Sequence, residues 1–177
     1  MKLPQSKVPE AFLHALPEGI KFIHRRGQEF LVVETVCCPA GHSLVEEDVR
    51  IHGEPSIQIE VDTGASRGRI YIDAFWGGHD KFYDFIPVLA PNAATIQAFC
   101  PVCGVSLLAE LACSQPGCDS TKAVLFTLPD GKNKIWVCAR LGCSGHHLEI
   151  PNLPGDIAEL VDDINYFCHN DDLFQGI

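Results

Sequence analysis

The sequence has no long apolar segment. Nowhere in its 177 residues do eighteen apolar residues follow one another, and residues 1–10 (MKLPQSKVPE) contain no apolar core of signal-peptide length. We therefore expect a cytoplasmic protein without membrane contact. Low-complexity segments are also missing, and 46% hydrophobic residues with 20% charged residues exclude a disordered tail. The length suits one ordinary domain or two small ones.

Basic residues are scarce. Thirteen Lys and Arg stand against twenty-three Asp and Glu, which gives a net charge of −10. No Lys or Arg follows Arg140, whereas seven acidic residues do. Because binding to a phosphate backbone draws on clustered basic side chains, this composition disfavours a general nucleic-acid binder. The acidic end is interpreted as a solvated face or as a docking surface for a basic partner.

Complete catalytic sets are also missing: there is no Gly-rich phosphate loop and no Ser/His/Asp grouping. His52-Gly53-Glu54 with Cys100 and Cys103 is superficially similar to the zinc deaminases. Phe99 stands where those enzymes have proline, however, and a strand-like segment follows where they need a helix. His79 and Asp80 can in principle act as acid and base, but a loop anchored by aromatic residues explains them more simply.

Cysteine, by contrast, is abundant. The chain has nine cysteines, and most of them come in close pairs. In a reducing cytosol such pairs are typical of metal ligands and not of disulfides, and an odd total agrees with that interpretation.

Alternating apolar and polar residues predict three β-hairpins, and one segment has helical spacing. The hairpins are expected in residues 19–36, 57–73 and 123–138. Ile157, Leu160, Val161, Ile164 and Cys168 form the apolar stripe of a C-terminal helix. Asp156 and Glu159 are spaced as in a capping box at its start, and Cys168 is expected in core packing.

Four short segments supply paired ligands. Three share a Cys, three residues, a Gly and a second ligand: Cys37 to His42, Cys113 to Cys118, and Cys138 to Cys143; the fourth pair is Cys100 and Cys103. Zn²⁺ takes four such ligands in a tetrahedron, and one tight turn can present two of them. A glycine beside the second ligand allows positive φ, so that backbone N–H groups can point at the thiolates.

Pairing by chain order predicts two metal sites. Cys113, Cys118, Cys138 and Cys143 form one, with nineteen residues between its two pairs. His42, Cys100, Cys103 and either Cys37 or Cys38 form the other, across a 57-residue insertion. The repeat favours Cys37, whereas the likeness of Cys38-Pro39 to Cys100-Pro101 favours Cys38. A cross-braced arrangement, as in RING-like domains, is the alternative to pairing by chain order.

The segment Cys100-Pro101-Val102-Cys103-Gly104 resembles the knuckle of zinc-ribbon and rubredoxin-type proteins. The resemblance covers residues 100–147 and the short stretch 37–42. Three pairs depart from it by having four intervening residues instead of two. We expect an α+β fold, mostly β, with zinc-ribbon-like hairpins around two metal sites and a C-terminal helix. The expected units are a β-rich domain (1–99), a zinc-ribbon-like module (100–150) and an acidic helix and tail (151–177).

Two zinc ions are the expected cofactors, with iron as the alternative at the all-cysteine site. Four ligands close each site, which favours a structural role, although His146 and His147 can substitute for a cysteine or flank the site. The favoured function is a non-catalytic scaffold or accessory subunit that binds a protein partner through exposed aromatic residues such as Trp76, Phe82 and Tyr83 and through its acidic C-terminal tail. The alternatives are an iron-dependent redox protein or zinc enzyme, and a nucleic-acid-binding ribbon that uses Lys122, Lys132, Lys134 and Arg140.

Overall fold

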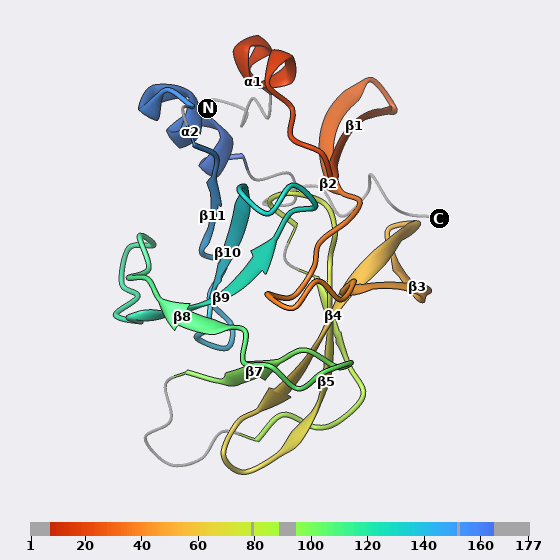
Figure 1. Ribbon diagram of the computed structural model, residues 1–177, viewed down its shortest axis with the longest axis vertical. Coiled ribbons are helices and arrows are strands. Elements are labelled where there is room, and N and C mark those ends of the chain that lie inside the picture. Colours follow the sequence, from red (N-terminus) through yellow and green to blue (C-terminus); the bar gives the residue numbers. More distant parts are fainter. Residues whose placement is uncertain (1–7, 79, 89–94, 152, 165–177) are drawn as a thin grey trace.

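The computed structural model describes residues 8–78, 80–88, 95–151 and 153–164. In this part of the chain the protein is built from short antiparallel strands with two helices (Figure 1). The prediction of an α+β fold that is mostly β is therefore confirmed. The helices are α1 (Glu10–His14) and α2 (Gly155–Asp162). The strands are β1 (Ile20–Arg25), β2 (Gln28–Val33), β3 (Val45–Ile51), β4 (Glu54–Asp62), β5 (Arg67–Ile72), β6 (Lys81–Tyr83), β7 (Gln97–Phe99), β8 (Leu108–Glu110), β9 (Lys122–Thr127), β10 (Lys134–Cys138) and β11 (His146–Glu149).

The predicted hairpin in residues 19–36 is the separate β1–β2 sheet. Its turn places Arg26 and Gly27 at φ 48° and 76°, the left-handed region that a two-residue hairpin turn requires. The second predicted hairpin is β4–β5, in which Ile57 pairs with Ile72 and Asp62 with Arg67. Both hairpin predictions are confirmed.

The β4–β5 hairpin forms the centre of a five-stranded sheet. The strand order is β3-β4-β5-β6, and β7 adds to β4 from later in the chain. β3 and β4 are joined by His52 and Gly53, and β5 and β6 are joined by residues 73–80. Because the strands are antiparallel, both connections lie at the same end of the sheet, which brings His52 near Asp73 and Asp80.

The third predicted hairpin, β9–β10, is confirmed and lies inside a four-stranded sheet of order β11-β10-β9-β8. Its turn has Gly131 at φ 74°. In Figure 1 this sheet stands to one side of β3, β4 and β5, and the β1–β2 hairpin stands apart near α1. The cysteine loops 113–120 and 138–145 are attached to its strands, so the sheet sets their positions.

One hydrophobic cluster joins the three sheets. It includes Phe30 from β2, Ile59 from β4 and Phe126 from β9, none of them more than 1% exposed. The rings of Phe30 and Phe75 meet edge to face with centroids 5.5 Å apart. Side chains from the N-terminal hairpin, the central sheet and the cysteine-rich part therefore share one core.

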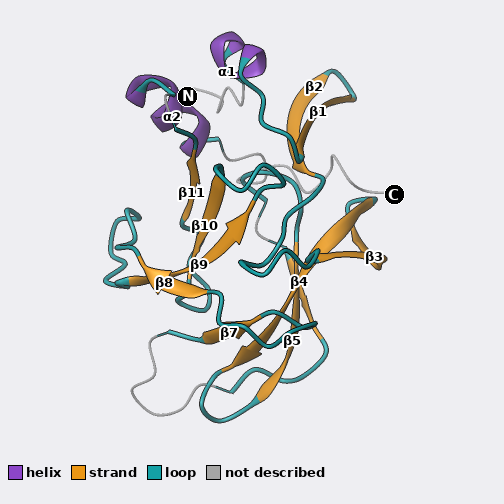
Figure 2. Ribbon diagram, in the orientation of Figure 1, coloured by secondary structure: helices purple, strands orange, loops and turns teal. Residues whose placement is uncertain are grey.

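Helix α2 packs on this core. Val161 is fully buried, and its carbonyl accepts a hydrogen bond of 2.7 Å from Trp76 Nε1. The helices α1 and α2 contact each other and lie together in Figure 2. The helix starts one residue before the predicted Asp156, and Pro154 occupies the N-cap without a side-chain cap, so the capping-box prediction is wrong. Cys168 lies outside the described residues. Among the described residues, no helix has the length and apolar character needed to cross a membrane.

Candidate metal centres

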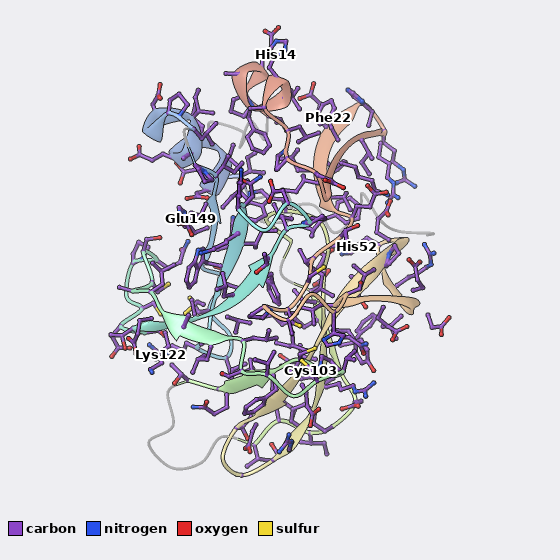
Figure 3. The ribbon with its side chains drawn as sticks, in the orientation of Figure 1. His14, Phe22, His52, Cys103, Lys122 and Glu149 are labelled. Carbon is purple, nitrogen blue, oxygen red and sulfur yellow. The ribbon has the colours of Figure 1, made fainter. Side chains whose placement is uncertain are left out.

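The first group of ligands, the N-terminal cluster, consists of Cys38, His42, Cys100 and Cys103. One ligand atom from each lies within 4.8 Å of all the others. The first two residues lie in the loop between β2 and β3, and the last two lie in the turn that follows β7. Figure 3 shows Cys103 close to β7. β7 pairs with β4, and this pairing brings the two loops together although 57 residues separate them.

The distances inside this cluster match a tetrahedral metal site. Cys38 Sγ lies 3.5 Å from His42 Nδ1 and 3.9 Å from Cys103 Sγ. Zinc–sulfur and zinc–nitrogen bonds in a tetrahedron separate two sulfurs by about 3.8 Å, and a sulfur from a nitrogen by about 3.5 Å. The side chains are thus already spaced for four-coordinate binding of one ion.

Cys37 does not belong to this cluster. Its backbone N–H donates to the Thr127 carbonyl at 2.8 Å, and its carbonyl accepts from the Thr127 N–H at 3.0 Å. This bridge to the end of β9 holds Cys37 in extended backbone, where neighbouring side chains point to opposite sides. Cys38 therefore faces His42 while Cys37 faces away, and the geometry favours Cys38 as the ligand.

The second group, the C-terminal cluster, consists of Cys113, Cys118, Cys138 and Cys143, again with all four sulfurs within 4.8 Å of one another. Cys113 Sγ lies 3.7 Å from Cys143 Sγ, and Cys118 Sγ lies 3.7 Å from Cys138 Sγ. These separations are again those expected around one tetrahedral metal ion. The structure groups the ligands in chain order and not in the cross-braced order.

The repeated motif forms the same loop twice. Cys113 N donates to the Ser120 carbonyl, and Cys138 N donates to the Gly145 carbonyl seven residues on, both at 2.9 Å. The second cysteine of each loop donates its N–H to the residue two positions after the first, at 3.1 Å. One sequence pattern therefore specifies one local structure.

Backbone N–H groups point at the thiols, as the sequence predicts. The donor is the residue two positions after the cysteine, at 3.4–3.5 Å, for Cys100, Cys113, Cys138 and Cys143. The knuckle glycines all adopt positive φ: Gly41, Gly104, Gly117 and Gly142. These N–H dipoles offset the negative charge of a thiolate, so the loops suit ionised cysteine.

The four thiols of the C-terminal cluster need a bound cation if all of them are to be ionised. Burial, together with the neighbouring Cys143 thiol, raises the pKa of Cys113 to about 12. A backbone hydrogen bond from Ser120 lowers the pKa of Cys118 to about 7. Four thiolates this close repel one another, so some stay protonated unless a divalent cation compensates their charge.

The N-terminal cluster shows the same contrast. Burial acts to raise the pKa of Cys38, but hydrogen bonds from His42 outweigh it and lower that pKa to about 6. Burial raises the pKa of Cys100. Cys38 is therefore ionised more readily than Cys100 and is available as a thiolate for an incoming cation.

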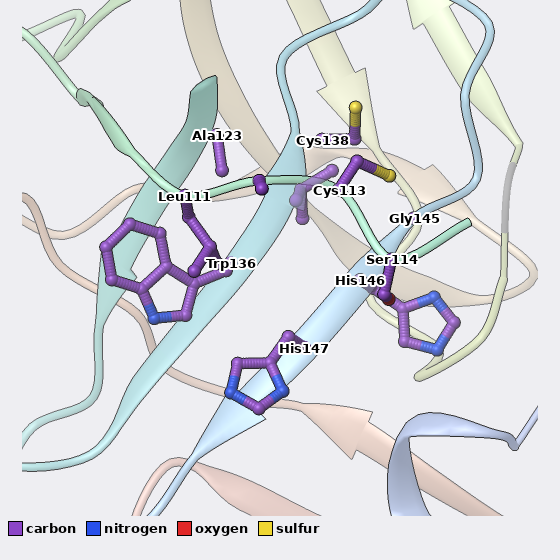
Figure 4. Close-up of a pocket in the computed structure, with 11 residues that line it drawn as sticks. Leu111, Cys113, Ser114, Ala123, Trp136, Cys138, Gly145, His146 and His147 are labelled. Atoms are coloured by element: carbon purple, nitrogen blue, oxygen red, sulfur yellow. The ribbon is translucent and has the colours of Figure 1, made fainter. Parts of the chain in front are cut away.

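His146 and His147 lie beside the C-terminal cluster but outside it. Figure 4 shows both imidazoles pointing away from the sulfurs of Cys113 and Cys138. His147 Nδ1 instead lies 2.5 Å from Asp162 Oδ2, and Asp162 Oδ1 accepts from the Leu148 N–H at 2.9 Å. Asp162 thereby ties α2 to β11.

This contact makes the docking of α2 depend on pH. The hydrogen bond from His147 to Asp162 and the Asp162 charge raise the pKa of His147 above its ordinary value, although partial burial lowers it. The stabilisation is fully present below the pKa of the unfolded chain and is lost as pH rises through the folded pKa. His147→Gln should therefore lower the free energy of unfolding at about pH 6 by on the order of 1 kcal/mol, and by much less at about pH 9. Urea titrations at both pH values measure this. The exposed His24→Gln is the control, and an equal loss at both pH values would contradict the assignment.

Comparison with protein-family models, with curated proteins and with solved structures finds no match to this chain. The two clusters are consistent with zinc-binding knuckles by their geometry alone.

Proposed function

We propose that the chain is a non-catalytic scaffold held by two zinc ions, which presents a binding edge to another protein. The zinc-binding part of this proposal is supported by the two four-ligand clusters, in which pairs of sulfurs lie 3.7–3.9 Å apart. Four protein ligands leave no open position for water on a tetrahedral ion, which is the arrangement of structural and not catalytic zinc. Thiolates and imidazole suit zinc, and the all-cysteine cluster also suits iron.

The metals would cross-link loops that are separated in the sequence. The N-terminal cluster joins the β2–β3 loop to the turn after β7, and the C-terminal cluster joins the loops on either side of β9 and β10. β7 and β8 have only three residues each. Structural zinc contributes on the order of 10 kcal/mol in small modules, comparable to the whole stability of a domain.

Chelation tests the structural role. A strong zinc chelator should abolish the cooperative thermal transition of the full chain and much of its β-type circular dichroism, and two equivalents of Zn²⁺ should restore both. The same chelator saturated with Zn²⁺ beforehand is the control. A chain that loses its metal and keeps its transition would contradict the proposal.

The binding edge is formed by β6 and the residues after it. β6 is the last strand of its sheet in the described part of the chain, so one side of its backbone is unpaired there. Large apolar side chains are exposed on β6 (Phe82 51%, Tyr83 38%) and on the residues that follow it (Ile86 82%, Val88 51%). An exposed apolar edge strand is a template for an extended segment of another chain. We name these four residues the β6 edge and propose that it pairs with such a segment.

Trp76 is not part of this surface. Phe82 and Tyr83 are exposed as predicted, but Trp76 is only 4% exposed, because its ring packs on His146 and its Nε1 is bonded to α2. The prediction of an exposed Trp76 is wrong.

Affinity capture with a matched variant tests the β6 edge. In cells of the source organism, tagged wild-type chain should enrich a partner that Phe82→Lys/Ile86→Lys fails to enrich. The control is Val102→Lys, which changes a side chain that is 63% exposed in the knuckle after β7. If no enriched protein depends on Phe82 and Ile86, the proposed binding edge is wrong.

The basic residues near β9 and β10 support nucleic-acid binding only weakly. Lys122 Nζ lies 2.8 Å from Glu110, and Arg140 Nη1 lies 2.9 Å from Asp119. Two of the four cations are therefore already paired with carboxylates, which favours the protein partner over a phosphate backbone.

A further inference from the structure

A third group of ligand-type side chains contains no cysteine and consists of His52, Asp73 and Asp80. His52 lies in the β3–β4 turn, Asp73 directly follows β5, and Asp80 directly precedes β6. The antiparallel register gathers these three positions at one end of the five-stranded sheet, and the Asp73 N–H donates to the Asp80 carbonyl at 3.1 Å. Figure 3 shows His52 at the end of β3. One ligand atom from each residue lies within 4.8 Å of the other two.

The site has a buried floor and an open rim. The side chain of Asp73 is 0% exposed, that of His52 is 17% exposed, and that of Asp80 is 61% exposed. His52 Nε2 lies 3.5 Å from Asp73 Oδ2 and 2.6 Å from Asp80 Oδ2. A ligand can therefore enter past Asp80 and reach the buried carboxylate.

An ion pair with His52 alone does not explain the buried carboxylate of Asp73. Its Oδ1 accepts the Phe75 N–H at 3.0 Å, which fixes the carboxyl plane, but its buried Oδ2 has no hydrogen-bond partner. A buried carboxylate oxygen without a donor is costly. Burial raises the pKa of Asp73 to about 7. A cation bound beside Oδ2 would satisfy this atom and offset the cost of burying the charge.

His52 is held in place through its backbone. Its φ of 54° lies in the left-handed region, which is uncommon for residues other than glycine. Arg25 Nη1 donates to the His52 carbonyl at 2.6 Å, and the His52 ring meets Phe75 edge to face. The imidazole is thus fixed before any ligand arrives, as is usual for residues that bind metals.

We propose that His52, Asp73 and Asp80 bind a third divalent cation, a borderline to hard transition-metal ion of the Mn²⁺ or Zn²⁺ class. One imidazole and two carboxylates differ in kind from the thiolate clusters, so this site also accepts harder ions such as Mn²⁺, which thiolates bind poorly. Three protein ligands leave positions for water or another ligand, unlike the two four-ligand clusters. The cation displaces the proton between His52 Nε2 and Asp80 Oδ2, and these atoms separate to about 3 Å around it.

Titration of the full chain with Mn²⁺ tests this site. The two thiol clusters are first loaded with zinc, which Mn²⁺ does not displace from thiolates. The electron paramagnetic resonance signal of free Mn²⁺ should then report one bound ion per chain near neutral pH. Asp73→Asn and His52→Asn should each weaken binding by at least about tenfold. Asparagine is chosen at position 52 because it tolerates left-handed backbone.

Two further variants keep the test decisive. Asp80→Asn alters an exposed side chain and should weaken binding without endangering the fold, which circular dichroism verifies for every variant. His24→Asn changes an exposed imidazole that lies 3.9 Å from a Glu29 oxygen and meets the Phe22 ring edge to face, and this variant should bind Mn²⁺ like the wild type. The proposal is overturned if neither Mn²⁺ nor Zn²⁺ binds beyond the two thiol clusters at millimolar concentration. It is also overturned if binding is unchanged in Asp73→Asn and His52→Asn.

Discussion

Cys38→Ser is expected to release one of the two metal ions, whereas Cys37→Ser is expected to retain both. Cys38 Sγ lies 3.5 Å from His42 Nδ1 and 3.9 Å from Cys103 Sγ, so its loss leaves three ligands in the N-terminal cluster. Cys37 is held in the bridge to Thr127 with its side chain outside the cluster. Serine preserves the approximate size of cysteine and removes the thiolate, so the comparison isolates the ligand.

The two variants are each other's control. Native mass spectrometry counts the ions, and thermal unfolding measures the consequence. A structural zinc site contributes about 10 kcal/mol to folding, and a whole domain is stable by only about 5–15 kcal/mol. Loss of one zinc should therefore lower the free energy of unfolding by several kcal/mol, and Cys38→Ser should unfold at a much lower temperature. Two ions in Cys38→Ser, or one ion in Cys37→Ser, would show that the ligand is misassigned.

Gly145→Ala is expected to disrupt the C-terminal cluster without touching a ligand. A Cβ at this position would lie 2.7 Å from Cys113 Sγ and 3.3 Å from Cys138 Cβ. A metal-bound sulfur cannot move aside as a free side chain can, so the methyl group must displace the loop or the ligand. We expect zinc affinity at this cluster to fall by more than about tenfold, measured by competition with a chromophoric chelator.

Two other glycines separate this clash from ordinary glycine effects. Gly155→Ala places a methyl group where no heavy atom lies within 4 Å and should leave both metals in place. Gly117→Ala also meets open space, but φ there is 79°, so it should cost about 1–2 kcal/mol through backbone strain and still bind zinc. Unchanged affinity in Gly145→Ala would mean that its backbone does not pack against Cys113.

The elements found from the sequence are those that local residues determine. The β1–β2, β4–β5 and β9–β10 hairpins carry alternating apolar residues on both sides of a turn with glycine, so nearest neighbours suffice to predict them. The knuckle glycines could also be predicted from local residues, because a short loop that presents two ligands needs positive φ close to them.

The elements missed are short or interrupted. β6, β7 and β8 have three residues each, too few to show alternation, and depend on their partner strands. β3 contains the acidic run Glu46-Glu47-Asp48, and its register with β4 shifts between Glu46 and Arg50. An acidic run of this kind indicates a solvated face and not a strand, and Glu47 and Asp48 are exposed on β3.

The ligand at positions 37 and 38 and the burial of Trp76 could not be predicted from neighbouring residues, because they depend on residues far away in the sequence. Cys37 is kept out of its cluster by Thr127, and Trp76 is buried by Val161, each about 90 residues away in sequence. The sequence singled out His52 and Asp80 for other motifs and missed Asp73, which directly follows β5 and has no recognisable motif around it. Only the register of the sheet shows that the three lie together.

Metal content of the purified full chain tests the central claim most directly. Elemental analysis combined with native mass spectrometry should find two zinc ions per chain, with one lost from Cys38→Ser and one lost from Cys138→Ser. Wild-type chain that is folded and free of metal, or that holds iron in the C-terminal cluster, would contradict the two-zinc scaffold.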